Sequence, residues 1–235
     1  MKIAAVADVH ARVGDTERLR DLVRGAARDA DVLVIGGDLT DLGRLEQAEV
    51  FLEVLDPCPI PVVATLGNHD YENGNVAELS RLLAESTVHF LDRSSVVIDG
   101  VGFSGVKGFC GGFGLNAANA FGEDLFKAWV TEGIVDAEAL KNELRELKTE
   151  RRVAVLHYAP IRATVEGEPP EIHAFLGTSH LARALDEGGA TIAFHGHAHH
   201  GSFKGKTPGG VPVFNVSLPV LEYEGFENPY HVVEA

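Results

Sequence analysis

Short clusters of aspartate, asparagine and histidine recur along the chain, each directly after a run of apolar residues. The clustered side chains are Asp8, His10, Asp38, Asn68, His69, His157, His197 and His199. Imidazole and carboxylate ligands without a thiolate suit hydrolytic metal ions such as manganese, iron or zinc. There are more of these side chains than one ion needs, which favours two ions that share a bridging carboxylate.

The spacing within the clusters supports a metal site. Asp8 and His10 lie two residues apart, as do His197 and His199, so each pair points to one side of an extended segment. Glycines accompany the clusters and let the backbone turn sharply beside bulky ligands. They are Gly36, Gly37, Gly67 and Gly196.

The apolar runs that precede the clusters predict strands buried on both faces. These runs cover residues 3–7, 32–35, 60–66, 153–156 and 191–194. Apolar residues at helical spacing predict helices between the strands. The helical stripes cover residues 19–30, 45–55, 76–83, 140–147 and 181–185. This alternation predicts βαβ units, and the carboxyl ends of parallel strands open into one crevice where the clusters should meet.

Two further stretches predict hairpins, which would make the sheet structure mixed. Residues 96–98 and 101–103 flank Asp99-Gly100, a signal for a two-residue type I′ turn. Residues 203–206 and 211–214 flank a Pro-Gly-Gly turn. The stretch from Gly108 to Val130 fits neither pattern, and we expect a loop and short helices there.

Taken together, the motif blocks resemble the calcineurin-like metallophosphoesterase superfamily. The blocks are Asp8-Val9-His10, Gly37-Asp38-Leu39-Thr40-Asp41, Gly67-Asn68-His69-Asp70, His157 and Gly196-His197-Ala198-His199. They occur in the family's order and span residues 8–199, which is most of the chain.

The resemblance implies an α/β fold, a two-sheet mixed β-sandwich flanked by helices, as one calcineurin-like domain over residues 1–235. It also implies two divalent or trivalent metal ions, drawn from Mn, Fe, Zn, Mg and Ni. The first ion would be held by Asp8, His10 and His199, and the second by Asn68, His157 and His197. Asp38 would bridge both ions.

The resemblance assigns catalytic roles to the residues beside the ligands. His69 would face the scissile phosphate and assist the leaving oxygen, and Asp70 would orient His69 through its ring nitrogen. Asp41 would be structural near the metal loop. A metal-bridging hydroxide would attack the phosphorus of the ester.

Composition excludes several other classes of protein. The chain has 235 residues, 45% of them hydrophobic, and a formal charge of −15. This is a globular composition, and the acidic excess argues against non-specific binding to nucleic acid.

No apolar run approaches the ~20 residues that span a bilayer, and no secretory leader is visible. With only two cysteines, Cys58 and Cys110, we expect reduced thiols and a cytoplasmic protein. The sequence leaves the oligomeric state open.

The expected substrate is a small phosphate ester, with diesters favoured because a monoester brings more negative charge to an acidic protein. A phosphomonoesterase, a DNA-repair-type nuclease of the same superfamily and a metal-free protein-binding scaffold remain as alternatives. The role of the 104–135 insertion is open. For Arg12, Lys107 and Arg162 the simpler interpretation is solvated surface, and for Phe126 and Trp129 it is the core of the inserted segment. His195 and His200 lie outside the ligand set.

Overall fold

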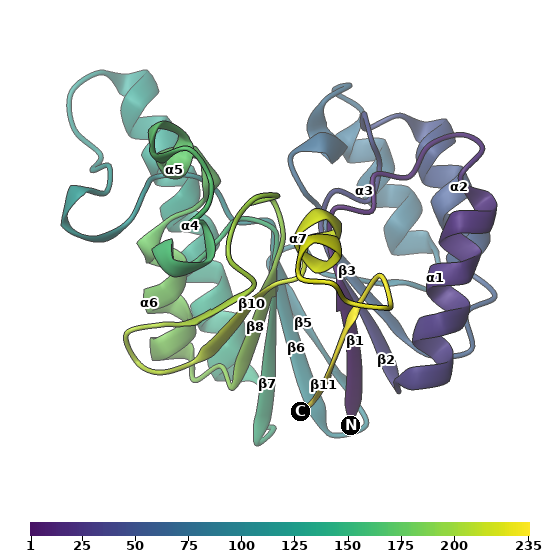
Figure 1. Ribbon diagram of the computed structural model, residues 1–235. Helices are drawn as coiled ribbons and strands as arrows, with labels where there is room; N and C mark the ends of the chain where they lie inside the picture. The colour runs from purple at the N-terminus through teal and green to yellow at the C-terminus, as the bar shows by residue number, and fades with distance from the viewer.

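The computed structural model describes residues 1–235, and in it two sheets pack against each other with helices on their outer faces (Figure 1). The first sheet has the strand order β11-β1-β2-β3-β4, and the second has the order β5-β6-β7-β8-β10-β9. Both sheets contain parallel and antiparallel pairs. The predicted two-sheet mixed sandwich is therefore confirmed.

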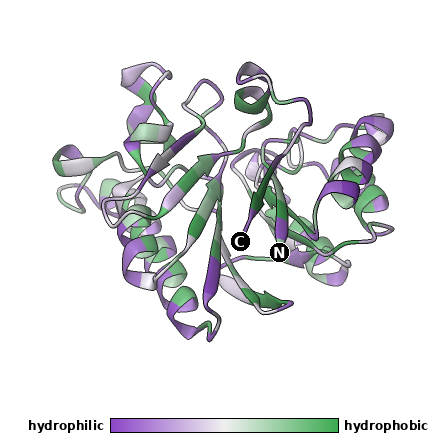
Figure 2. Cartoon of the chain, turned by 60° about the horizontal axis from the view of Figure 1, so that its bottom comes forward, coloured by the Kyte–Doolittle hydropathy of each residue, from purple (hydrophilic) through white to green (hydrophobic).

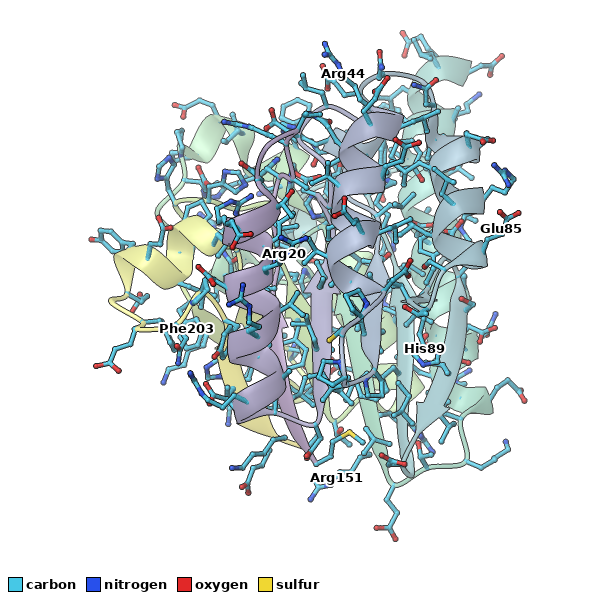
Figure 3. All side chains as sticks on the ribbon, turned by 90° about the vertical axis from the view of Figure 1, so that its right-hand side faces the viewer. Arg20, Arg44, Glu85, His89, Arg151 and Phe203 are labelled. Atoms are coloured by element: carbon cyan, nitrogen blue, oxygen red, sulfur yellow. The ribbon has the colours of Figure 1, made fainter.

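The first sheet is parallel except at one edge. Its strands are β1 (Lys2–Val6), β2 (Val32–Gly36), β3 (Val62–Thr65), β4 (His89–Phe90) and β11 (His231–Glu234). Only β11 runs antiparallel, beside β1, so the two chain ends lie together at the bottom of Figure 1. The helices α1 (Thr16–Asp29), α2 (Leu45–Leu55) and α3 (Val76–Glu85) cover the outer face. Figure 3 looks onto these helices and shows charged side chains such as Arg20 and Glu85 at their outer surface.

The second sheet has three parallel pairs flanked by two hairpin strands. Its strands are β5 (Ser94–Ile98), β6 (Val101–Val106), β7 (Arg151–Leu156), β8 (Ile192–His195), β9 (Lys204–Lys206) and β10 (Pro212–Asn215). Its outer face packs on α4 (Asp124–Glu146) and α6 (Ser179–Gly188). The remaining helices are α5 (His173–Leu176), α7 (Leu218–Tyr223) and short 3₁₀ turns at His69–Tyr71, Gly114–Asn116, Arg162–Thr164 and Pro170–Ile172. None of the helices is long and apolar enough to cross a membrane.

Burial on both faces explains the continuous apolar runs of the central strands. In β1, Ile3 and Ala5 face the layer between the two sheets, while Ala4 and Val6 face the helices. Both directions lead into core, so the strand has no solvent face that would need polar residues. Figure 2 shows the same pattern, with largely hydrophobic strands and helices that are hydrophobic on one side only.

Both predicted hairpins are present. β5 pairs antiparallel with β6 and β9 with β10. At the first turn Asp99 has φ +46° and Gly100 has φ +82°. Two successive positive φ values are what a type I′ turn requires, because this turn follows the twist of the strands.

The stretch 108–130 differs from the prediction of a loop with short helices. The loop ends at Glu123, and α4 then runs for 23 residues from Asp124. Its stripe includes Asp136, a buried acid that bonds Arg93 at 2.6 Å. It also includes Gly133, where an added Cβ would lie 3.1 Å from the Cys110 carbonyl oxygen. A buried acid and a glycine interrupt the apolar period, which is why the sequence pattern placed the helix too late.

Candidate metal centre

The polar clusters meet at the carboxyl ends of both sheets. Asp8, Asp38 and Asn68 follow β1, β2 and β3 of the first sheet, and His157 and His197 follow β7 and β8 of the second. These strand ends lie at the top of the sandwich in Figure 1. The predicted convergence therefore occurs, although it joins two sheets and not one.

One group of ligand atoms is compact. Asp8, His10, Asp38 and His199 each offer a nitrogen or oxygen, and these atoms all lie within 4.8 Å of one another. Nε2 of His199 is 2.9 Å from Oδ1 of Asp8, and Nε2 of His10 is 3.7 Å from Oδ2 of Asp38. Two carboxylates and two imidazoles at this spacing form a set that could hold one ion.

A second group lies on the other side of Asp38. Nε2 of His157 is 2.8 Å from Oδ1 of Asn68 and 3.4 Å from Oδ1 of Asp38. The ring of His197 lies 4.9 Å from that of His157 between centroids. Asp38 thus directs one oxygen to each group, as a bridging ligand must.

The protonation of His157 indicates that this second group fits a cation. Its Nδ1 lies 3.0 Å from the carbonyl oxygen of Gly36, which can only accept, so Nδ1 carries the hydrogen. Burial lowers the pKa of His157 well below its usual value, so the ring is neutral. The Nε2 lone pair therefore faces the oxygens of Asn68 and Asp38 with no proton between them. A positive ion among these three acceptors would remove the repulsion between them.

The two buried carboxylates of the centre, Asp8 and Asp38, differ in how readily they ionise. Burial, together with the neighbouring charge of Asp8, raises the pKa of Asp38 well above its usual value. Burial also opposes ionisation of Asp8, but a hydrogen bond from His199 lowers its pKa to about 2. Bound cations are the largest local charges in such sites and would stabilise both ionised carboxylates.

The backbone around the ligands adopts a conformation that side chains rarely take. Only six non-glycine residues have positive φ, and four of them belong to the expected ligands: Asp8 (59°), His10 (43°), Asp38 (49°) and His197 (70°). Strain of this kind collects at functional sites, where the surrounding structure enforces it.

Two of the accompanying glycines are required by close contacts. A Cβ on Gly67 would collide with the Asp38 carboxylate, and one on Gly196 would collide with that of Asp8. Each carboxylate is thus seated directly against the backbone of a neighbouring cluster, which any side chain there would displace.

His69 lies at the edge of the centre, next to Asn68. Its Nδ1 is 2.7 Å from the carbonyl oxygen of Asp41, so this nitrogen carries a hydrogen and donates it. Its Nε2 is directed inward, 4.0 Å from Oδ2 of Asp38. The side chain as a whole is 36% exposed, so His69 lies at the surface of the centre.

The expected contact between Asp70 and His69 is wrong. The Asp70 carboxylate is fully buried and accepts hydrogen bonds from the backbone N–H groups of Leu39, Thr40 and Gly67, and from the Thr40 hydroxyl. Its oxygens are therefore committed to holding the Asp38 and Asn68 loops together. The carbonyl of Asp41 orients His69 instead, and no residue-type pattern could signal that, because every residue has a carbonyl.

Arg12 and His195 both have specific partners. Arg12 pairs with Asp41, with 3.0 Å between Nε and Oδ2. His195, outside the ligand set, is fully buried, and its ring nitrogens bond the Gly196 carbonyl and the Thr164 hydroxyl, both at 2.8 Å. His195 is therefore not free to act on a ligand, whereas the Arg12 side chain is 65% exposed, in line with the interpretation as solvated surface.

Lys107 is largely enclosed, contrary to the interpretation as solvated surface. Its ammonium lies 4.7–5.3 Å from the ring centroids of Tyr71, Phe109 and Tyr158 and donates to the Gly108 carbonyl at 2.7 Å. Burial lowers its pKa. The rings come from three separate segments, so no local sequence pattern indicates this cage.

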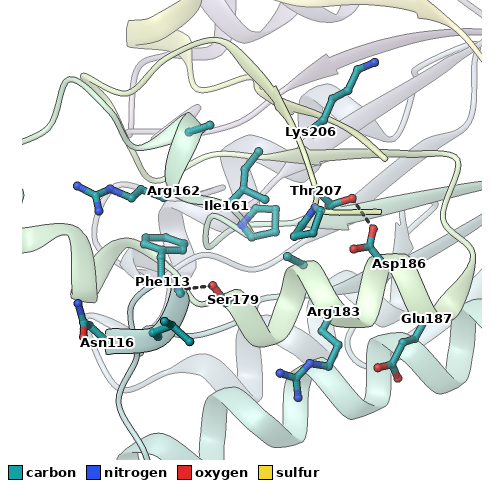
Figure 4. Close-up of a pocket in the computed structure, with 16 residues that line it drawn as sticks. Phe113, Asn116, Ile161, Arg162, Ser179, Arg183, Asp186, Glu187, Lys206 and Thr207 are labelled. Carbon is teal, nitrogen blue, oxygen red and sulfur yellow. Dashed lines mark hydrogen bonds between the residues drawn. The ribbon is translucent and has the colours of Figure 1, made fainter. Parts of the chain in front are cut away.

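Of two cavities in the surface, one reaches the expected ligands and the other does not. One of about 830 Å³ reaches the centre at His199 and is otherwise bordered by residues such as Glu166, Glu222 and Tyr223. Another, of about 990 Å³, lies between α6 and the β9 turn (Figure 4) and is lined by none of the expected ligands. In Figure 4 the heads of Arg162, Arg183 and Lys206 point in different directions, so these cations do not converge on a common anion.

Comparison with known proteins identifies solved structures that share this fold. Among solved structures, the chain is similar to the phosphopantetheinyl hydrolase PptH from Mycobacterium tuberculosis, at 16% identity and a TM-score of 0.71, covering 99% of this chain and 95% of that one. It is similar to the protein TT1561 of Thermus thermophilus at 18% identity and a TM-score of 0.61, covering 91% and 88%. A putative 5′-nucleotidase from Staphylococcus aureus matches at 14% identity and a TM-score of 0.54, covering 91% of this chain and 48% of that one. At these identities the likeness concerns the fold.

A search of curated proteins found no match to the sequence. The sequence model described as calcineurin-like phosphoesterase, however, matches residues 1–201, the part of the chain that carries every residue of both ligand groups. The chain belongs to the calcineurin-like phosphoesterase family.

Proposed function

We propose that this protein is a hydrolase of small phosphate esters that uses two metal ions and prefers diesters to monoesters. The observation that carries the proposal is the pair of ligand groups that share Asp38, with one of its oxygens facing each group. Family membership supports phosphate-ester chemistry.

In this proposal Asp8, His10 and His199 hold the first ion, Asn68, His157 and His197 hold the second, and Asp38 touches both. The ions, when bound, supply positive charge for the phosphate oxygens and activate a water for attack. The donor set of carboxylate, imidazole and amide accepts Mn, Fe, Zn, Mg or Ni. Asp70 has the supporting role of fixing the loops that carry Asp38 and Asn68.

His69 is the proposed proton donor to the leaving oxygen. The Asp41 carbonyl holds its Nδ1–H, so a second proton on Nε2 would point into the centre. A positioned imidazolium of this kind contributes typically about 10²–10⁴-fold to the rate.

The preference for diesters rests on charge. A monoester dianion brings about two negative charges to a protein of net charge −15, whereas a diester brings one. The cavity that reaches His199 is also bordered by acids such as Glu166 and Glu222, which disfavour a second negative charge.

The test is a comparison of kcat/KM for bis(4-nitrophenyl) phosphate and 4-nitrophenyl phosphate with the same metal and pH. We expect the diester to be preferred. A monoester advantage of about tenfold, ~1.4 kcal/mol in transition-state binding, would assign the protein as a phosphomonoesterase. Hydrolysis of neither compound by metal-loaded protein would favour a protein-binding scaffold.

A further inference from the structure

Large apolar side chains that face solvent are concentrated beside the metal centre. Twelve such residues are exposed in the chain, and six of them lie just before or at the start of α4 and in or next to α5. Among the six, Phe121, Phe126 and Phe175 are 68%, 36% and 58% exposed, and Leu125 is 85% exposed. We call these four residues the apolar wall. Phe126, expected in the core, thus belongs to the surface.

The apolar wall is connected to the metal centre by a series of ring contacts. The ring of Phe121 lies 5.7 Å from that of Phe126, which stacks on Trp129 at 5.8 Å. Trp129 lies 6.4 Å from Phe175, and these separations are typical of interacting aromatic pairs. The carbonyl oxygen of Phe175 is 3.3 Å from Nε2 of His197, one of the proposed ligands. The wall therefore begins at the ligand shell and leads outward.

Two segments far apart in sequence build this surface, and backbone hydrogen bonds join them. Gly111 N–H donates to the Ala174 carbonyl and Gly112 N–H to the Gly177 carbonyl, both at 2.8 Å. Figure 1 shows the resulting arrangement, with the loop that enters α4 extending from the molecule beside α5. These bonds give the wall a defined position relative to the metal centre.

The kind of ligand that binds the apolar wall follows from two features, the contact of the wall with the metal centre and the charge around it. An exposed apolar patch of this kind usually marks a binding site. The start of α4 also carries Glu123 and Asp124, and the exposed Asp124 pairs with Lys127 at 3.1 Å, which leaves one carboxylate in excess. With no excess of positive charge beside the apolar rings, an anionic surface is disfavoured as the partner and an uncharged organic group is favoured.

We infer that the apolar wall binds the organic part of the ester, so that the substrates are phosphate esters carrying an extended apolar group. This inference rests on the proposed phosphoesterase activity and names the class of substrate for the same site. The phosphate would lie at the metal ligands, and the apolar group would extend from His197 along Phe175 towards Phe121.

The experiment measures kcat/KM for 4-nitrophenyl methyl, butyl and octyl phosphates, each below its aggregation concentration and with one metal. We expect kcat/KM to rise with chain length, by about fourfold for each methylene that leaves water. The double variant Phe121→Ser/Leu125→Ser should at least halve the slope of log(kcat/KM) against chain length. Because the slope compares substrates within one variant, a general loss of activity does not change it.

Val97→Ser is the matched control, since Val97 is 53% exposed on β5, outside the two segments of the wall. It should keep the wild-type slope. Hydrolysis of the methyl ester with a flat wild-type slope would overturn the inference and leave the proposed function standing. Absence of hydrolysis of every ester by metal-loaded protein would overturn both. A dimer that the Phe121→Ser/Leu125→Ser variant dissociates, together with a flat slope, would assign the wall to a second copy of the chain.

Discussion

At the scale of single residues, the centre depends on groups that hold the ligands as much as on the ligands themselves. Asp70 binds three backbone N–H groups and a hydroxyl, and the Asp41 carbonyl orients His69. The separate roles of His69 and Asp70 can therefore be tested. His69 should affect the rate of the reaction, and Asp70 should affect the stability of the loops that carry the ligands.

His69→Ala should retain the bound metal and lose roughly 10²–10⁴-fold in turnover on esters with poor leaving groups. The loss should shrink for 4-nitrophenyl esters, since nitrophenolate needs little protonation to leave. Turnover is measured beside elemental analysis, with His89→Ala as the control that should behave as wild type, since His89 is exposed on β4 away from the centre. Loss of metal from His69→Ala would show that this ring is a ligand.

Asp70→Asn should lower stability and metal affinity together. The new amide NH₂ would face N–H donors, and a buried hydrogen-bonded charge would be lost, at a cost of about 2 kcal/mol or more. Urea unfolding and metal titration provide the measurement. A variant with wild-type stability and reduced turnover alone would instead support the orienting role that the sequence suggested.

At the scale of elements, the sequence predicted what continuous local patterns encode. The central strands could be predicted because they are buried on both faces, and the hairpin at Asp99-Gly100 because its turn needs two positive φ values. The start of α4, the helix α7 and the strand β11 could not be predicted. The first is masked by Asp136 and Gly133, and the other two are short, so their formation depends on packing against distant segments.

Some features of the candidate site could likewise be predicted from local sequence patterns, and others could not. Strand-end positions of Asp8, Asp38 and His157 follow from the order of apolar runs and polar clusters. The cage around Lys107 and the apolar wall depend on contacts between segments far apart in the chain, which no local pattern records. The Asp70–His69 contact came from resemblance alone and is wrong, because both Asp70 oxygens are occupied by the loops.

Tyr230, the residue before β11, packs on α1 and gives a prediction at this scale. Gly25 lies inside α1, where alanine would ordinarily stabilise the helix by about 1 kcal/mol. Here an added Cβ would lie 2.8 Å from the Tyr230 hydroxyl and 3.1 Å from its ring. Overpacking costs about 1–3 kcal/mol, so Gly25→Ala should destabilise the protein by about 1 kcal/mol net.

Urea unfolding of a double-mutant cycle with Tyr230→Ala measures the two contributions. In the Tyr230→Ala background the steric term is absent, and Gly25→Ala should become stabilising. If Gly25→Ala stabilises the protein even with Tyr230 present, Tyr230 moves aside at little cost and its packing on α1 is weak.

At the scale of the whole molecule, the metal centre joins two sheets whose ligands span residues 8–199. Ions that bind only the folded arrangement must stabilise it. At metal concentrations 100-fold above Kd the gain is about 2.7 kcal/mol for each independent site. Thermal melting with Mn²⁺ should therefore occur well above melting in a chelator, and coincident curves would speak against a formed centre.

The central claim is that Asp38 joins two metal sites, and metal stoichiometry by elemental analysis tests it most directly. The wild-type chain loaded with Mn²⁺ should retain two ions per chain after removal of free metal. Asp38→Asn should weaken both sites at once, because it removes the one carboxylate that faces both ligand groups, and should retain fewer than one ion on average. Two tightly held ions in Asp38→Asn, with normal turnover, would contradict the account.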